Sequence, residues 1–321
     1  MNDMQQYRIL ISGSSGFVGQ NLIQHFNREE YVLTGLSRAN SHAGENGLFK
    51  QLNWKTISAA ELNNTDAIIH LAGKAHDVKN VSDPQEYFTV NTGLTQQLFD
   101  LFLQSSTKDF IYFSSVKAAA DTVDGILDET AIPNPQTAYG QSKLKAEEYL
   151  LSAVLPQGKR VIIIRPCMIH GPGNKGNLNL LYQFVQKGIP YPLAAFDNQR
   201  SFLSVHNLCC IIEQVLQTPT VVSGIYHVSD DETLSTNQVV SIISTVLNRK
   251  PRLLSIPQWL LKALASIGDK IKLPLNSERL KKLTESYVVS NKKIKQALQI
   301  ERLPLSAEEG LRKTIESFRS L

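Results

Sequence analysis

The glycine-rich stretch "GSSGFVG" (Gly13–Gly19) constrains the fold more than any other part of this sequence. It follows the apolar run Arg8–Gly13 and leads into a helical pattern over Phe17–Arg28. Between a buried strand and a helix, Gly13 can make the tight turn, Gly16 lets the backbone approach a ligand, and Gly19 permits close helix–strand packing. The N–H groups and partial positive charge at the start of the helix favour a phosphate. We therefore expect a bound dinucleotide, although a purely structural turn would use the same glycines.

Four further runs read as buried strands because they are rich in β-branched or aromatic residues and almost continuously apolar. They are Tyr31–Arg38, Asp66–Gly73, Lys108–Ser115 and Lys159–Pro166. Continuous apolar runs are typical of a parallel sheet covered on both faces. Helical patterns over Tyr87–Gln104 and Ala138–Ala153 lie between them. This alternation predicts an α/β fold with a doubly wound parallel sheet of Rossmann type.

The character of the chain changes after Arg165. The stretch "RPCMIHGPGNKGN" is rich in glycine, proline and asparagine, which is typical of an irregular loop, and later segments are helical with isolated prolines. We expect residues 1–165, with about 203–228, to form the NAD(P)-binding domain. Residues 166–202 and 229–321 would form a smaller C-terminal substrate-binding lobe over the carboxyl edge of the sheet.

Composition excludes several classes of protein. The chain has 33 Lys and Arg against 29 Asp and Glu, a net charge of +4, which argues against a nucleic-acid-binding protein but suits a small anionic substrate. The three cysteines lack a CxxC spacing, and the His and Cys residues form no zinc pattern, so we predict a reducing compartment and no metal. The N-terminus is polar and no apolar run reaches the roughly 20 residues of a membrane span. We expect a cytoplasmic protein. The apolar stretch Trp259–Gly268 is expected to pack internally, and contact with a membrane surface is the alternative.

The end of the second strand bears on the choice of cofactor. NAD sites usually place an acid there to accept a hydrogen bond from the ribose 2′-OH. This chain has Ser37 and Arg38 instead. A guanidinium can pair with a 2′-phosphate, so we expect NADP, with NAD as the alternative. Arg38 would otherwise be only a solvated charge.

A tyrosine and a lysine four residues apart, Tyr139 and Lys143, begin the helical pattern "AYGQSKLKAEE". Residues with this spacing face the same side of a helix. A tyrosine with a pKa of about 10 is a reluctant acid–base group, and a nearby ammonium should lower that pKa. Ser115 ends the preceding strand at the same sheet edge and could hold a substrate oxygen. His70 lies within an apolar run, so we expect a strand-interior histidine.

With these residues in view, the chain resembles the extended short-chain dehydrogenases/reductases that act on nucleotide sugars. The marks are the three spaced glycines, "DAIIHLAG", Asn91 in "YFTVNTG", the Ser114–Ser115 strand end, Tyr139-x-x-x-Lys143 and "RP…HGPG". The resemblance implies Ser115, Tyr139 and Lys143 as catalytic residues. The cofactor-binding residues that the glycine loop, the second strand and the resemblance imply together are Gly13, Ser14, Ser15, Gly16, Phe17, Val18, Ser37, Arg38, Leu71, Ala72, Gly73, Asn91, Tyr139, Lys143 and Pro166.

Two reactions of this family remain open for the chain. The 4,6-dehydratases have an Asp-Glu pair directly after the active serine or threonine, where this chain has Val116 and Lys117, so elimination of water is not expected. The sequence looks most like bacterial UDP-sugar enzymes of O-antigen and capsule synthesis. We expect an NADP-dependent 4-reductase of a UDP-4-keto-6-deoxy-N-acetylhexosamine. The alternative is an NAD-dependent UDP-hexose or UDP-N-acetylhexosamine 4-epimerase, and a non-catalytic dinucleotide sensor is a more distant one.

The resemblance also implies a substrate site and an assembly. Besides Ser115, it places Asn177 and Arg200 at the nucleotide diphosphate and Arg279 at a second phosphate contact, although either arginine could be a surface charge. The family commonly forms homodimers through two helices per subunit, here Tyr87–Gln104 and Ala138–Ala153. The apolar residues Leu94, Leu98 and Leu101 suit such an interface, and they would suit an internal core equally well.

Overall fold

The computed structural model describes residues 6–38, 50–74, 83–174, 176–271 and 276–319. Its centre is a seven-stranded sheet in the order β10-β7-β5-β4-β1-β2-β3, with every neighbouring pair parallel. The strands of this sheet are β1 Tyr7–Ser12, β2 Tyr31–Ser37, β3 Lys50–Asn53, β4 Ala67–His70, β5 Asp109–Phe113, β7 Arg160–Pro166 and β10 Gly224–Val228. The doubly wound parallel sheet expected from the sequence is therefore confirmed.

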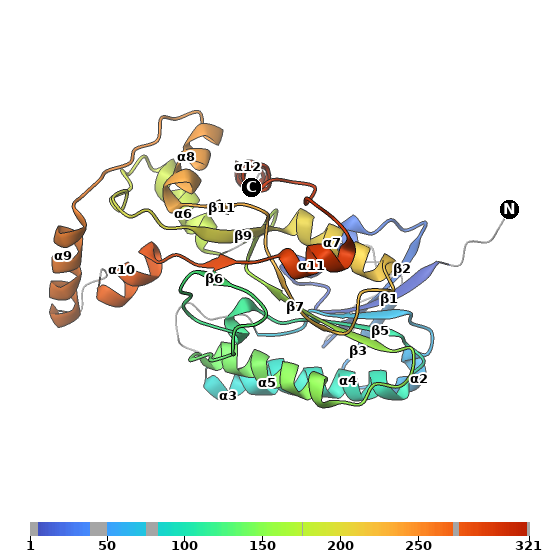
Figure 1. Ribbon diagram of the computed structural model, residues 1–321. Helices are drawn as coiled ribbons and strands as arrows, with labels where there is room; N and C mark the ends of the chain where they lie inside the picture. Colours follow the sequence, from blue (N-terminus) through green and yellow to red (C-terminus); the bar gives the residue numbers. More distant parts are fainter. Residues whose placement is uncertain (1–5, 39–49, 75–82, 175, 272–275, 320–321) are drawn as a thin grey trace.

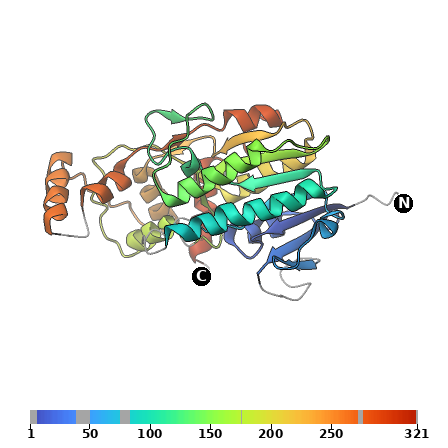
Figure 2. The same ribbon diagram turned by 90° about the horizontal axis from the view of Figure 1, so that it is seen from below.

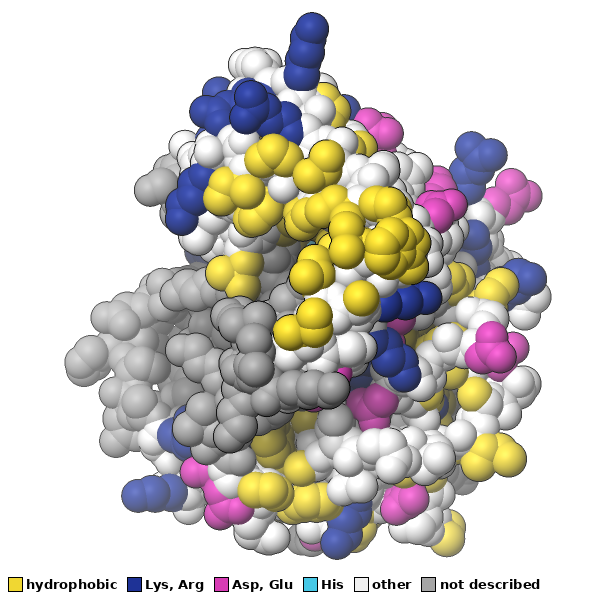
Figure 3. All heavy atoms as spheres, turned by 90° about the vertical axis from the view of Figure 1, so that its left-hand side faces the viewer, with side chains coloured by type: hydrophobic (Ala, Val, Ile, Leu, Met, Phe, Trp, Pro, Cys, Tyr) yellow, Lys and Arg dark blue, Asp and Glu magenta, His cyan; other side chains and the backbone are white. Residues whose placement is uncertain are grey.

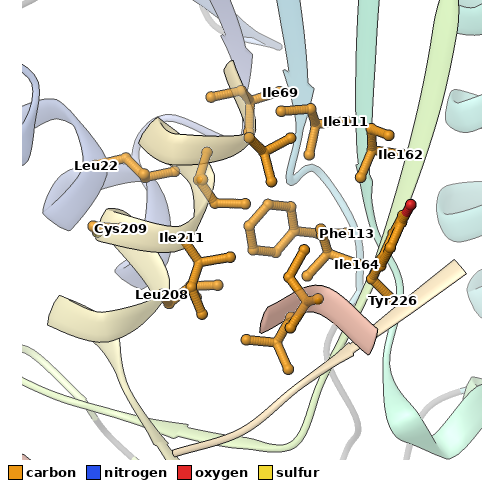
Figure 4. Packing of buried hydrophobic residues seen from close by; sticks show 14 of the residues in the cluster. Leu22, Ile69, Ile111, Phe113, Ile162, Ile164, Leu208, Cys209, Ile211 and Tyr226 are labelled. Atoms are coloured by element: carbon orange, nitrogen blue, oxygen red, sulfur yellow. The ribbon is translucent and has the colours of Figure 1, made fainter. Parts of the chain in front are cut away.

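One face of the sheet is covered by α1 (Phe17–His25), α7 (Val205–Gln217) and α11 (Lys292–Leu298) (Figure 1). Their apolar side chains share one core with the sheet. Figure 4 shows the side chains of this core meeting around Phe113 of β5, with Leu208 and Ile211 coming from α7. Burial on this scale is the main driving force for folding.

The opposite face is covered by α2 (Ala59–Leu62), α4 (Leu94–Gln104) and α5 (Ala138–Ser152). The last two lie side by side across the strands (Figure 2). The short α3 (Pro84–Tyr87) and a π-helical turn, Phe88–Gly93, lead directly into α4, so the single predicted helix contains a change of helix type. Leu98 is fully buried within this chain, so it belongs to the internal core.

The remaining elements gather at the carboxyl end of the sheet (Figure 1). Two small sheets, β11-β9-β8 and β12-β6, link this region to the main body. Their strands are β6 Ile126–Leu127, β8 Met168–His170, β9 Arg200–Ser204, β11 Thr233–Leu234 and β12 Val288–Val289. The helices here are α6 Asn177–Gln186, α8 Thr236–Val246, α9 Gln258–Ile271, α10 Ser277–Thr284 and α12 Ala307–Arg319. They share a second core. Among the described residues no helix is both long enough and apolar enough to cross a membrane.

Candidate functional site

The glycine loop lies at the point where the strand order of the sheet reverses, between β1 and β4. Ligands of doubly wound sheets bind at the carboxyl ends of the strands at this point. Gly13 has a φ of 71°, and a Cβ there would lie 2.9 Å from the backbone nitrogen of Ala72. A Cβ at Gly19 would lie 2.5 Å from the carbonyl oxygen of Gly13. Both glycines are thus required by close backbone contact.

The start of α1 is suited to hold a diphosphate. Its N-cap residue is Gly16, which has no side chain that could accept from the N–H groups of the first turn. No acidic residue lies in that turn. The N–H groups of that turn can therefore point at a phosphate. Ser15 and Gly16 are exposed, Phe17 and Val18 are partly buried, and Ser14 is buried. These residues fit the diphosphate of a nicotinamide dinucleotide, because the first turn of α1 contains no carboxylate that would repel the phosphates or accept from the same N–H groups.

Asn91, on the π-helical turn, connects the strand-end loop to α5. Its Oδ1 accepts a hydrogen bond from the backbone nitrogen of Lys74 (2.7 Å), and its Nδ2 donates to the Oγ of Ser142 (2.9 Å). A Cβ at Gly73 would lie 2.9 Å from Asn91 Oδ1 and 3.1 Å from Lys143 Nζ. The loop Leu71–Gly73 is therefore held close to both predicted functional side chains.

His70 belongs to a buried hydrogen-bonded chain behind this loop. Its Nδ1 lies 2.6 Å from Ser12 Oγ, and its Nε2 lies 2.9 Å from Thr95 Oγ1. Thr95 donates to the carbonyl of Asn91 (2.6 Å), so the imidazole is the donor to Thr95. Burial, together with the positive charge of Lys143, lowers the pKa of His70 to about 3. A neutral His70 thus fixes β1, β4 and the turn that bears Asn91.

The second strand ends as the sequence predicts, with Ser37 as its last residue and Arg38 exposed beyond it. β2 pairs in parallel with β1, and Ser12 lies opposite Leu36. The end of β2 therefore lies beside the glycine loop. A ribose next to a diphosphate in that loop would be within reach of this strand end.

Ser115, Tyr139 and Lys143 are brought together by the start of α5. Thr137 Oγ1 caps this helix by accepting from the backbone nitrogen of Gly140 (3.2 Å). A Cβ at Gly140 would lie 2.4 Å from the carbonyl oxygen of Lys117, so the helix packs directly on the turn after β5. The Tyr139 side chain forms a hydrogen bond with Ser115. The Lys143 ammonium donates to the carbonyl of Phe113 (2.8 Å).

The pKa values in this cluster correct one expectation. Burial raises the pKa of Tyr139, the hydrogen bond with Ser115 lowers it, and Tyr87 raises it. The direction is therefore opposite to the lowering that we expected from Lys143. The reason is that burial is the largest influence on the phenol. Burial also lowers the pKa of the Lys143 ammonium to about 8. In the free protein near neutral pH the phenol is protonated and can act as a proton donor.

A buried charge pair adjoins these residues. Glu147 lies four residues after Lys143 on the same face of α5 and is 1% exposed. Its carboxylate accepts from the Nε of Arg165 (2.9 Å) and from the hydroxyl of Ser114, and it raises the pKa of Lys143. Glu147 was not predicted from the sequence, although its spacing continues that of Tyr139 and Lys143.

Sequence comparisons show the family to which the chain belongs. The sequence model described as "NAD dependent epimerase/dehydratase family" matches residues 9–229. The chain belongs to this family. The UDP-glucose 4-epimerase of Vibrio cholerae is 30% identical over 97% of this chain and 95% of its own. The N-acetyl-alpha-D-glucosaminyl-diphospho-ditrans,octacis-undecaprenol 4-epimerase of Escherichia coli O157:H7 is 26% identical over 98% and 95%.

Among solved structures, the UDP-N-acetylglucosamine 4-epimerase of Bacillus cereus superposes with a TM-score of 0.75 at 20% identity, over 98% of this chain and 100% of its own. That likeness concerns the fold. The family match and the 30% identical relative, which covers nearly the whole chain, identify the chain as an NAD(P)-dependent sugar-nucleotide epimerase or reductase. Among the described residues, no group of three or more His, Cys, Asp or Glu could hold a metal ion.

The residues expected at the substrate lie on separate elements. Asn177 is the exposed first residue of α6. Pro166, which is expected at the cofactor and not at the substrate, is the buried last residue of β7. Arg200 begins β9, and its guanidinium donates to the carbonyls of Glu285 (3.2 Å) and Lys282 at the end of α10. Arg279 lies in the first turn of α10 and is exposed. Their roles at the diphosphate stay predictions.

Lys117 is a further residue of this region. From the sequence it served only to distinguish the chain from the dehydratases, and no structural role was predicted for it. Its ammonium donates to the carbonyl of Asp121 (2.8 Å) and lies 4.1 Å from the centre of the Tyr287 ring. Burial lowers its pKa. The Tyr287 hydroxyl donates to the carbonyl of Ala120 (2.7 Å), so both side chains tie the turn after β5 in place.

Proposed function

We propose that this protein reduces the C4 keto group of a UDP-4-keto-6-deoxy-N-acetylhexosamine with NADPH, in the synthesis of bacterial surface polysaccharide precursors. The observation that carries the proposal is the end of β2. Ser37 and an exposed Arg38 stand there, beside the glycine loop, where an NAD site has an acid. A guanidinium at this position favours a 2′-phosphate.

The protonation of Tyr139 supports the direction of the reaction. A reduction of a ketone needs a proton for the oxygen as well as a hydride for the carbon. A reduced nicotinamide would supply the hydride. Tyr139, whose pKa is raised by burial, would give its proton to the C4 oxygen, and Ser115 would hold that oxygen by a hydrogen bond. The ammonium of Lys143 would stabilise the phenolate that remains. The C=O bond thereby becomes a CH–OH group.

The assay for this proposal is oxidation of NADPH and NADH with UDP-4-keto-6-deoxy-N-acetylglucosamine, made in the same cuvette by a 4,6-dehydratase. We expect one NADPH consumed for each UDP-6-deoxy-sugar formed, with NADH used less well. The matched control is the same reaction mixture with the Tyr139→Phe variant in place of the wild-type protein. NMR of the product gives its configuration at C4. No oxidation of either nucleotide would refute the reductase.

A 4-epimerase is the second candidate, favoured by the full-length similarity to two proteins named as 4-epimerases. An epimerase would use NAD, oxidise C4 and reduce its other face without net consumption of cofactor. Interconversion of UDP-N-acetylglucosamine and UDP-N-acetylgalactosamine, or of UDP-glucose and UDP-galactose, in the absence of added nucleotide would establish it. The same result would show that Arg38 does not select NADP.

A further inference from the structure

Helix α9 has two apolar faces, and only one of them packs against the protein. Leu261, Ala265 and Gly268 are buried. On the other side Trp259 is 71% exposed, and Leu260, Leu264 and Ile267 are exposed by 37%, 46% and 52%. The expectation that this stretch packs internally therefore holds for one face only.

The extended segment before α9 adds to this surface. Leu253 and Leu254 are exposed, and this segment pairs with the loop that contains Tyr191. The Tyr191 N–H donates to the carbonyl of Arg252 (2.7 Å), and the Leu254 N–H donates to the carbonyl of Tyr191 (2.8 Å). We call the six side chains Leu253, Leu254, Trp259, Leu260, Leu264 and Ile267 the α9 patch. Figure 3 faces this end of the molecule and shows a broad field of hydrophobic side chains, with Lys and Arg along its upper margin. A contiguous exposed apolar patch on a globular protein marks an interaction site.

The segment of the chain that contains the α9 patch is rich in positive charge. Residues 249–283 contain nine Lys and Arg against two Asp and Glu. That excess is larger than the net charge of the whole chain, +4, so the remainder of the chain is acidic on balance. Arg249, Lys250 and Arg252 are exposed directly before the patch, and Lys262 is exposed on α9 itself. The two acidic residues are already engaged: Asp269 accepts from Ser277, and Glu278 pairs with Lys282.

We propose that the α9 patch docks this protein onto the surface of an anionic lipid bilayer. Helices that lie in a membrane interface combine an exposed apolar face containing Trp, Phe or Leu with Lys and Arg at its border. Trp259 suits the headgroup level, because its ring is amphipathic. The flanking Lys and Arg are attracted to anionic headgroups. Each adds a favourable free energy of binding to that of the apolar contact.

A second copy of this chain fits the patch less well than a lipid surface. Symmetric contact between two copies would place the basic border of one patch against the basic border of the other, and like charges oppose association. An anionic bilayer presents the opposite charge over the whole border. Docking would also hold the carboxyl end of the sheet toward the membrane, because α9 and α10 lie at that end (Figure 1).

The first experiment uses the full chain and its own fluorescence. The chain has two tryptophans, and Trp54 is 6% exposed while Trp259 is 71% exposed. Vesicles of phosphatidylethanolamine with phosphatidylglycerol should therefore shift the emission of Trp259 to shorter wavelength and sediment the protein. Pure phosphatidylcholine should bind it much more weakly, and high salt should release it. Absence of both binding and shift with the anionic vesicles at low salt would overturn the proposal.

Variants distinguish vesicle binding through the α9 patch from non-specific adsorption of exposed apolar side chains. The double variant Trp259→Ser/Leu264→Ser should weaken vesicle binding by at least about tenfold. Its matched control is Ile132→Ser/Val154→Ser, which removes two apolar side chains that are exposed elsewhere and should bind like the wild type. Lys250→Glu/Lys262→Glu should also weaken binding, whereas Lys55→Glu/Lys108→Glu, at exposed positions outside residues 249–283, should weaken it less.

Light scattering tests the rival occupant. All four variants should keep the mass of the wild type in solution and its thermal unfolding midpoint. A Trp259→Ser/Leu264→Ser protein that binds vesicles like the wild type would overturn the proposal. A fall in its mass from dimer to monomer, without a change in vesicle binding, would identify the α9 patch as an interface between copies and overturn it as well.

Discussion

Replacement of Glu147 by alanine should destabilise this protein severely, although Glu147 is not among the residues expected at the substrate. The carboxylate pairs with Arg165, and the two residues are each 1% exposed. Removing one partner of a buried pair leaves an uncompensated charge and costs about 3–5 kcal/mol. Ser114 also loses its buried acceptor. Since the free energy of unfolding of a whole domain is about 5–15 kcal/mol, Glu147→Ala should remove a large fraction of the stability.

Urea unfolding followed by circular dichroism measures this effect. The matched control is Glu148→Ala, which removes an exposed carboxylate from the next position of the same helix and should change the free energy of unfolding by at most about 0.5 kcal/mol. The double variant Glu147→Leu/Arg165→Met replaces the pair by apolar side chains and should recover much of the loss, because no buried charge is left unpaired.

The reasoning would be refuted if Glu147→Ala and Glu148→Ala unfolded at the same urea concentration. It would also be refuted if the double variant were less stable than Glu147→Ala, because the cost would then come from lost packing rather than from the orphaned guanidinium. Glu147→Gln provides a further readout. Loss of the carboxylate charge should lower the pKa of Lys143 below its present value of about 8, moving the alkaline limb of a pH–rate profile to lower pH.

Four further predictions concern the site. Tyr139→Phe should abolish turnover while NADPH binding, measured by fluorescence, stays unchanged; substantial turnover would remove Tyr139 from the proton path. Arg38→Ala should weaken the binding of NADPH by at least about tenfold and the binding of NADH only little, because a charge-assisted contact with the 2′-phosphate is lost. Equal weakening of both would argue against that contact. Arg200→Ala should raise the KM for the UDP-sugar more than it lowers kcat, and an unchanged KM would leave Arg200 as an anchor of α10 only. His70 stays neutral in the folded protein down to a pKa of about 3, whereas in the unfolded chain it takes up a proton below about pH 6.5, so its contribution to stability is present above pH 6.5 and lost as the pH falls. Wild type should therefore lose up to ~1.4 kcal/mol per pH unit more than His70→Asn below pH ~6 in urea titrations, and parallel curves would contradict a neutral buried imidazole.

Much of this fold follows from local patterns. The glycine spacing, the buried apolar runs and the tyrosine–lysine pair were sufficient to predict the parallel sheet and to locate the start of α1 and α5. Such patterns are informative because strand and helix periods act over a few residues, and because a tight turn against a phosphate admits only glycine. The position of Asn91 beside Lys143 was less accessible, because it depends on a π-helical turn that the apolar pattern of the helix does not reveal.

The family and the order of the strands along the chain can be recognised from local patterns, and the same patterns predict the residues suited to hold a dinucleotide. Which charges are buried, and which apolar side chains stay exposed, depends on the packing of the folded chain. Arg165 meets Glu147 across 18 residues, and His70 meets Ser12 across 58. Burial raises the pKa of Tyr139 against the expected effect of Lys143, and it leaves one apolar face of α9 in solvent. Burial depends on how the whole chain packs, so no window of neighbouring residues contains that information.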